Sequence, residues 1–321
     1  MPLAHWSVGQ ANTATEREST ESEAFGYAAG LLTWALAGGV FVAVKLGVGE
    51  LPPWTFCCWR AALAALVLTP FVWPYRQEIV EFLQKRGFEA FVIGALGLGL
   101  TQGTMFTALS YTSAVNVGII FATAPIITML LSHFIIHERL NAWQFLGSAI
   151  AFSGIVVVTV HGSFAKLLGI QFGLGDLLVV MASVMFACYS VLLKRAKFTL
   201  KRLPLLVILL SAGALADAPF FLWELWQGEH ENLGFVGYMT LLYTVIPGGA
   251  LLYLCYNWSI DILGPSRAGT LVYTQMIFTA LFAWLILGEA IEWYHYLGAG
   301  LIIAGVALVT WLGPKPSAAP K

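Results

Sequence analysis

Long apolar segments, separated by short clusters of charged residues, proline and glycine, make up most of the sequence. An α-helix needs about 20 apolar residues to cross a hydrocarbon layer of about 30 Å. Dividing the chain at the polar clusters leaves ten segments of that kind. They cover residues 26–46, 53–73, 89–109, 114–133, 142–161, 174–194, 203–223, 235–258, 266–287 and 293–312. The pattern predicts an all-α membrane protein with ten transmembrane helices.

Composition supports this prediction and argues against a soluble protein. Of the 321 residues, 59% are hydrophobic and only 10% are charged, and the mean hydropathy is +0.81. A soluble domain of this length carries far more charge on its surface. We therefore expect the lipid bilayer as the surrounding medium. Nucleic acid is not an expected partner, because the net charge is only −1.

Stretches that do not span the membrane are predicted at both ends and in the middle of the chain. Residues 1–25 contain the run TATERESTESE, and residues 313–321 read GPKPSAAPK. Both stretches have too few apolar residues to fold alone, so we expect disordered tails. Residues 162–173 are expected to link the two halves.

Basic residues collect on one side of the predicted membrane topology. That side holds Arg76, Lys85, Arg86, Arg139, Lys194, Arg195, Lys197, Lys201, Arg202 and Arg267, whereas the other holds Lys45 and Lys166. Loops rich in lysine and arginine stay in the cytoplasm during membrane insertion. Both termini are therefore predicted to be cytoplasmic, in a multi-pass protein of the inner membrane.

The chain contains an internal repeat. Shifting it by about 151 residues matches Gly118 with Gly269, Glu138 with Glu289, Gly147 with Gly298, and Gly154 with Gly305. An offset of about 149 residues matches Lys45 with Lys194. We expect two repeats, residues 26–161 and 174–312. Each holds five predicted helices, an odd number, so the second repeat must cross the membrane upside down relative to the first.

Two stretches carry a family resemblance. Residues 111–147, YTSAVNVGIIFATAPIITMLLSHFIIHERLNAWQFLG, and residues 263–298, LGPSRAGTLVYTQMIFTALFAWLILGEAIEWYHYLG, each contain a helix ending in glutamate. Each is followed by a helix with paired glycines. They resemble the two signature halves of the drug/metabolite transporter superfamily, in its EamA type. Among its members, bacterial exporters of amino acids, including aromatic ones, are most similar. The resemblance implies ten spans and export of a small metabolite.

The sequence departs from the family pattern at one position. Met276 stands where the first half has Pro125. Proline kinks a helix, so its loss predicts that the two repeat-related helices do not hinge alike.

A few ionisable residues lie within or next to the predicted helices. Arg60 is about 10 Å along its helix from Pro53, so its charge needs a partner, water, or a solute carboxylate or phosphate. Lys45 is expected at the membrane interface, either as an anchor or near the solute path. Glu138 and Glu289 are expected to cap the next helix. Asp217 is assigned a structural role near the end of its segment.

Polar and aromatic residues complete the predicted binding region, in the first, third, fourth, sixth, eighth and ninth segments. Amides and hydroxyls suit the ends of a zwitterion, and aromatic rings suit an apolar side chain. The full candidate set is Trp34, Phe41, Lys45, Arg60, Thr101, Gln102, Met105, Asn116, Phe121, Tyr189, Tyr243, Gly248, Tyr253, Asn257, Tyr273 and Gln275.

The remaining signals narrow the kind of protein. The four cysteines lie in apolar segments without CxxC spacing, and the sequence has no P-loop or GxSxG motif. We expect no cofactor, no metal and no enzymatic activity. The scarcity of deep carboxylates favours a facilitator over proton or sodium coupling.

The expected function is transport of a small molecule by alternating access. Amino acids or similar amphipathic metabolites are the preferred solutes, and a monomer is the expected assembly. The alternatives are a nucleoside, a cofactor or a drug-like cation as solute. From a different class, a membrane-embedded enzyme or a sensor also stays open.

Overall fold

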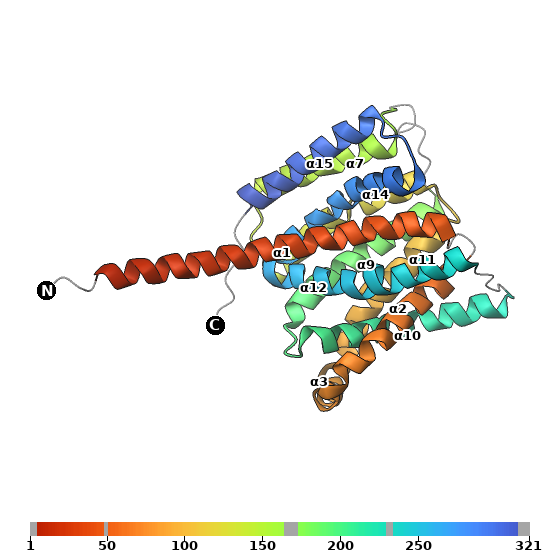
Figure 1. Ribbon diagram of the computed structural model, residues 1–321, viewed down its shortest axis with the longest axis horizontal. Coiled ribbons are helices and arrows are strands. Elements are labelled where there is room, and N and C mark those ends of the chain that lie inside the picture. Colours follow the sequence, from red (N-terminus) through yellow and green to blue (C-terminus); the bar gives the residue numbers. More distant parts are fainter. Residues whose placement is uncertain (1–4, 48–50, 164–172, 229–233, 314–321) are drawn as a thin grey trace.

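The computed structural model describes residues 5–47, 51–163, 173–228 and 234–313 (Figure 1). All regular elements in these ranges are helical. The first half contains α1 (His5–Gly47), α2 (Pro53–Val72), η1 (Trp73–Tyr75), α3 (Arg76–Gly94), η2 (Ala95–Leu100), α4 (Thr101–Ala108), α5 (Ala114–Phe121), α6 (Ala124–Ile136) and α7 (Ala142–Thr159). The second half contains α9 (Leu174–Ala196), α10 (Arg202–Trp226), α11 (Phe235–Val245), η3 (Ile246–Leu251), α12 (Leu252–Leu263), α13 (Pro265–Thr270), η4 (Leu271–Tyr273), α14 (Thr274–Leu287) and α15 (Trp293–Leu312).

Nine continuous helical stretches in the described ranges are long and apolar enough to cross a membrane. One of them, Pro53–Ala108, has 56 residues and contains two of the ten expected segments. At 1.5 Å per residue it would be about 84 Å long, far more than a bilayer requires. It bends instead at η1 and at Arg86, whose φ of −137° and ψ of 17° are not helical. The stretch therefore has room for two passes.

The N-terminal region differs from its prediction. Helix α1 begins at His5 and extends beyond the rest of the bundle (Figure 1), whereas residues 1–25 were expected to be disordered. Alanine, glutamate and arginine in this region favour helix, and a helix already started in the bundle adds residues easily. Most of the expected linker, and the tail from residue 314 onward, lie outside the described residues.

Helices α7 and α15 pack against each other through repeat-related glycines. A Cβ atom added at Gly147 would lie 2.6 Å from the carbonyl oxygen of Gly305. One added at Gly154 would lie 2.7 Å from the carbonyl oxygen of Gly298. Gly147 thus meets Gly305, the repeat partner of Gly154, and Gly154 meets Gly298, the repeat partner of Gly147. Residue numbers rise along α7 as they fall along α15, so the two helices run antiparallel. This reciprocal contact confirms the inverted relation of the two repeats.

Two π-helical turns occupy equivalent places in the repeats. Ala95–Leu100 and Ile246–Leu251 are separated by the same offset of about 151 residues as the matched glycines. A Cβ atom added at Gly97 would lie 2.1 Å from the Tyr189 ring, and one at Gly248 would lie 2.3 Å from Val40. Tyr189 and Val40 are themselves repeat partners. The small-residue runs in the sequence therefore let α9 and α1 approach these turns closely.

Both repeat-related helices are interrupted at equivalent places, and the predicted difference in how they hinge stays a prediction. The first-half helix is interrupted between α5 and α6, and the second-half helix is interrupted at η4, which occupies the equivalent place. The hydroxyl of Thr123 donates to the carbonyl of Ile120 at 2.6 Å, and that of Thr274 donates to Leu271 at 2.7 Å. Both threonines bond to the carbonyl three residues earlier, so the two interruptions share this side-chain contact.

One end of the bundle is rich in basic side chains, and we call it the basic end. Arg267, at the start of the second hinged helix, donates to the Tyr27 hydroxyl of α1 at 3.2 Å. It also donates to the carbonyl of Gly313, just after α15, at 3.0 Å. The membrane-spanning part of α1 therefore starts at the basic end, and helix α15 ends there. The opposite, acidic end holds Glu224 and Glu289.

The contact between α7 and α15 predicts a difference between two glycines of α15. A Cβ atom at Gly305 would lie 2.3 Å from the carbonyl oxygen of Gly147, whereas one at Gly300 would meet nothing within 4 Å. Gly305→Ala should cost roughly 1–3 kcal/mol through overpacking. Gly300→Ala, the matched control, should be neutral or gain up to about 1 kcal/mol of helix propensity. Thermal unfolding in detergent measures both, and equal melting temperatures would contradict this packing.

Candidate functional site

A cavity lies between the two repeats. It is formed by Trp34, Ala37, Val40 and Phe41 of α1, Arg60 of α2, Gln102, Met105 and Phe106 of α4, Phe121 of α5, Phe186 of α9, Gly248 of η3, Leu252, Tyr253 and Tyr256 of α12, and Gln275 of α14. Its volume is about 60 Å³, on a scale where one water needs about 10–15 Å³. A solute as large as an amino acid therefore requires the surrounding helices to move apart.

Arg60 is the charged residue among the described side chains that line the cavity. It is 5% exposed and is close enough to Tyr253 to interact with it electrostatically. Its guanidinium carbon lies 6.0 Å from the centroid of the Phe56 ring, within the range of a cation–π contact. The guanidinium still has donors to offer, because it carries five N–H groups. The wall thus presents one buried positive charge among aromatic rings.

Neutral polar groups accompany this charge. Gln102 lines the wall from the first repeat, and Gln275 lines it from the second. The indole nitrogen of Trp34 is buried and has no hydrogen-bond partner in the described part of the chain. A buried donor without a partner is costly, so a bound acceptor would stabilise this position.

Several predicted binding residues meet in the cavity. These are Trp34, Phe41, Arg60, Gln102, Met105, Phe121, Gly248, Tyr253 and Gln275. They come from seven different elements and both repeats, and all but Arg60 belong to the segments expected to form the site. Their contact with a solute stays a prediction.

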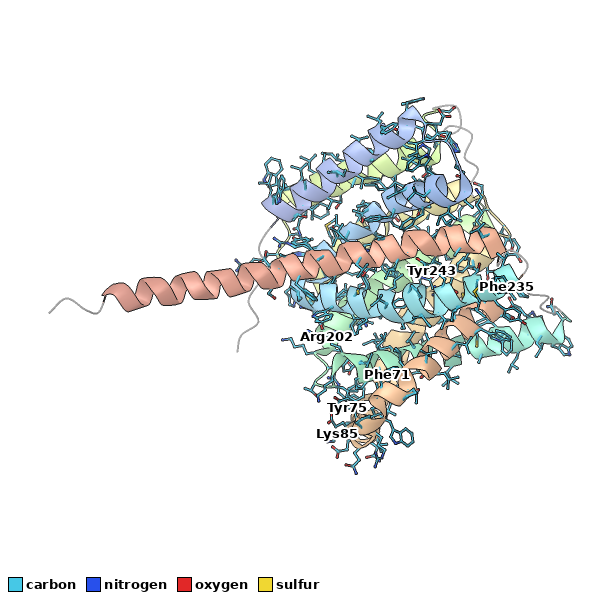
Figure 2. All side chains as sticks on the ribbon, in the orientation of Figure 1. Phe71, Tyr75, Lys85, Arg202, Phe235 and Tyr243 are labelled. Carbon is cyan, nitrogen blue, oxygen red and sulfur yellow. The ribbon has the colours of Figure 1, made fainter. Side chains whose placement is uncertain are left out.

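The other predicted residues lie outside the cavity lining, and each described one has an identifiable place. Lys45 pairs with Glu289 at the acidic end. The hydroxyl of Thr101 donates to the Leu96 carbonyl at 2.5 Å, and that of Tyr243, beside α1 in Figure 2, donates to the Leu36 carbonyl at 3.3 Å. Asn116 donates to Asp176 at 3.0 Å.

Tyr189, Asn257 and Tyr273 are buried in the bundle beside the cavity. Tyr189 donates its hydroxyl hydrogen bond to the Asn257 side chain. The Tyr273 hydroxyl has no partner among the described residues. In this conformation these side chains serve packing and closure.

Sequence reasoning missed part of the lining, namely Ala37, Val40, Phe186, Leu252 and Tyr256. Helical spacing carries a signal for some of them. Ala37 follows Trp34 by three residues and precedes Phe41 by four, and Tyr256 follows Tyr253 by three. Phe186 precedes the candidate Tyr189 by three residues, but Tyr189 lies outside the lining, so this spacing does not lead to the cavity.

A layer of aromatic and polar contacts closes the cavity toward the basic end. The ring of Phe186 stacks on Tyr256 with a centroid distance of 5.4 Å. Ser190 and Tyr256 share a hydrogen bond of 2.9 Å between their hydroxyls, next to the bond between Tyr189 and Asn257. These contacts join α9 to α12.

More polar contacts follow at the basic end itself. Lys194 of α9 donates to the Asp261 carbonyl, and Arg202 lies 3.2 Å from the Asp261 carboxylate. Ser266 donates to the Glu138 carboxylate at 2.7 Å. The predicted capping role of Glu138 and Glu289 is therefore wrong. The Asn141 side chain caps α7, and at the start of α15 the His295 ring accepts a hydrogen bond from the backbone amide of Glu292 at 3.0 Å.

The repeat partners of these closing residues stand apart at the other end. Tyr189 and Ser190 correspond to Val40 and Phe41, and Tyr256 and Asn257 correspond to Met105 and Phe106. All four of those partners line the open cavity. The contact between α9 and α12 thus has no counterpart between α1 and α4 in this conformation. The structure is closed toward the basic end and hollow toward the acidic end.

The comparisons with known proteins agree with this architecture. The sequence matches the EamA-like transporter family over residues 24–160 and again over residues 173–311. It is 26% identical to the uncharacterized transporter YyaM of Bacillus subtilis over 84% of this chain and 88% of that protein. It is also 26% identical to the uncharacterized inner membrane transporter YedA of Escherichia coli K12, over 88% of this chain and 91% of that one.

A solved crystal structure shares the fold. Its TM-score is 0.74 at 18% identity, and the match covers 91% of this chain and 97% of the other. Apolar helices in two inverted repeats around a central cavity define a multi-pass membrane transporter. The chain belongs to the EamA-like transporter family.

Glu138 predicts a pH dependence of this conformation. Burial raises the pKa of Glu138 above its ordinary value, opposed in part by the Ser266 hydrogen bond and the charge of Lys194. The stability that protonated Glu138 contributes is therefore fully present below the ordinary carboxyl pKa. It is lost as the pH rises through the raised pKa that Glu138 has in the folded protein. Glu138→Gln should stabilise the protein at pH 7 relative to wild type, by a few degrees at most, and less so near pH 5.

Thermal unfolding across that pH range measures the effect. Glu289→Gln is the matched control, because the repeat-related Glu289 is half exposed and pairs with Lys45. It should not reproduce the change with pH. A Glu138→Gln protein that follows the wild-type pH curve would contradict the assignment.

Proposed function

We propose that this transporter moves amino acids and similar small amphipathic carboxylates across a bacterial inner membrane. The observation that carries the proposal is Arg60, a buried positive charge in an otherwise aromatic and neutral cavity wall. A guanidinium binds a carboxylate through two parallel hydrogen bonds, and aromatic rings suit an apolar side chain. Export is the proposed direction, on the resemblance to bacterial amino acid exporters.

The same wall disfavours other solutes. A sugar phosphate calls for several converging lysines or arginines, and the described lining offers Arg60. A drug-like cation would be repelled by that residue, and no carboxylate lines the described cavity to attract it. A nucleoside or a neutral cofactor would leave the guanidinium without its best partner.

The proposed orientation places the basic end in the cytoplasm, with both termini there. Arg86, Lys194, Arg202 and Arg267 make their contacts at this end. Loops rich in such residues are retained inside during insertion. The conformation described is then closed to the cytoplasm and hollow toward the outside.

Alternating access is the proposed mechanism. Each of two inverted repeats can adopt the conformation that the other one has. A contact between two helices at one end of the bundle can then be replaced by the contact between their repeat partners at the other end. Separation of Tyr189 and Ser190 from α12 would open the cytoplasmic side. Approach of Val40 and Phe41 to Met105 and Phe106 would close the outer side. The outer closure is apolar and the inner one is hydrogen-bonded, so the two states need not be equally populated.

Counterflow in liposomes tests the proposed function. Purified protein in vesicles loaded with unlabelled phenylalanine should speed the entry of labelled phenylalanine from outside. Competition by tryptophan, methionine and threonine in the same assay ranks the solutes. No counterflow across a broad amino acid panel would refute this solute class.

Arg60 variants test the binding mode. Arg60→Ala should weaken the affinity for phenylalanine about 10- to 100-fold, which corresponds to a lost charge-assisted hydrogen bond of about 1.5–3 kcal/mol. Arg60→Lys should recover part of this loss, because lysine keeps the charge but not the paired donors. Lys85→Ala, at the exposed tip of α3 (Figure 2), is the control. Unchanged affinity in Arg60→Ala would assign Arg60 to structure alone.

A further inference from the structure

Asp217 is a buried acid that the fold leaves unsatisfied. It lies on α10, which packs against α2 and η2, and it is 0% exposed. Neither carboxyl oxygen has a hydrogen-bond partner in the described part of the chain. A Cβ atom added at Gly99 of η2 would lie 2.9 Å from Oδ1, so glycine keeps the space that the carboxyl group occupies. These contacts do not support the structural role expected from the sequence.

Other buried acids in the described bundle behave differently. Glu224, on the same helix, accepts hydrogen bonds from the backbone amides of Trp54 and Thr55 at 3.0 and 2.7 Å. Asp176 accepts from Thr112 at 2.6 Å and from the amide of Gly173 at 2.7 Å. Acids that hold a fold together are satisfied in this way. Asp217 therefore needs another explanation.

Arg60 supplies the positive charge in the surroundings of Asp217. The titratable groups that face Asp217 from α2 are Arg60 and the thiols of Cys57 and Cys58, and η2 contributes none. Glu224 is two turns away on α10 itself. Arg60 interacts with Asp217 through its charge but makes no hydrogen bond to it. The arginine of the cavity wall is thus shared between the cavity and Asp217.

We propose that Asp217 is the proton-binding residue of this transporter, and that a proton binds there together with a solute carboxylate at Arg60. The inference rests on the proposed function, because it takes Arg60 as the anchor of the solute carboxylate. It goes beyond that function by assigning a coupled ion and the residue that carries it.

The physical reason is competition for one positive charge. A carboxylate buried in a bilayer is stable as an anion only when a counter-charge is available. Without solute, Arg60 provides that charge. When a solute carboxylate binds Arg60, that positive charge is neutralised and Asp217 takes up a proton. By linkage, protonation of Asp217 strengthens solute binding by the same factor.

Solute and proton would therefore cross the membrane in the same direction. The proton forms an O–H bond on Asp217 as the solute binds, and that bond breaks when the solute leaves on the other side. Exported solute would carry a proton outward, so export toward an acidic exterior requires a solute gradient steeper than the opposing proton gradient. This departs from the expectation of an uncoupled facilitator.

The experiment uses the full chain in liposomes, with the membrane potential held at zero by valinomycin and equal potassium concentrations. With the outside one pH unit more acidic, labelled phenylalanine should accumulate inside up to about tenfold, the ratio for one proton per solute. Asp217→Asn should keep counterflow, which needs no net proton movement, and lose accumulation. Glu224→Gln is the matched control on the same helix and should accumulate phenylalanine as wild type does.

The outcomes separate the two proposals. Absence of counterflow in wild type refutes the proposed function. Counterflow without accumulation in wild type, or accumulation by Asp217→Asn as by wild type, refutes the coupling alone. If Asp217→Asn does not fold, a second measurement tests the coupling. Phenylalanine is added to purified wild-type protein in weakly buffered detergent solution, and the uptake of protons is measured. One proton per bound phenylalanine supports the inference, and none overturns it.

Discussion

Close packing of backbone against backbone is the constraint on which the rest of this structure depends. Helices in a bilayer gain little from hiding apolar side chains, because lipid is as apolar as they are. The repeats instead meet where glycine lets main chains touch, at Gly147 with Gly305 and Gly154 with Gly298. The same device brings Gly97 against Tyr189 and Gly248 against Val40. These contacts are reciprocal, so they fix two inverted repeats around a shared centre.

The cavity follows from that arrangement. Where the small residues end, larger side chains from both repeats cannot all meet, and a space remains beside Arg60. The repeats are alike in backbone but not in side chains. Tyr189, Ser190 and Asn257 close one side with hydrogen bonds, whereas their partners Val40, Phe41 and Phe106 are apolar. The backbone symmetry supplies two related conformations, and the side chains set the balance between them.

Much of the fold could be predicted from the sequence, because membrane helices and repeats leave strong periodic signals. The site was only partly predictable. Arg60 and Gly248 stand out in an apolar chain, but Phe186 reaches the cavity through packing that no local pattern encodes. Glu138 was misassigned because its partner Ser266 is remote in sequence. The comparison of the two hinges rested on Pro125 alone, whereas Thr123 and its repeat partner Thr274 make equivalent hydrogen bonds that the sequence pattern did not indicate.

Distances between spin labels at the two ends of the bundle test alternation between the repeats most directly. Lys45 and Ser110 form the outer pair, and their repeat partners Lys194 and Asp261 form the inner pair. Each pair is labelled in a separate variant whose native cysteines have been replaced. On adding phenylalanine, part of the population should show a shorter outer distance and a longer inner one. Distances that change together, or only at one end, would contradict the account.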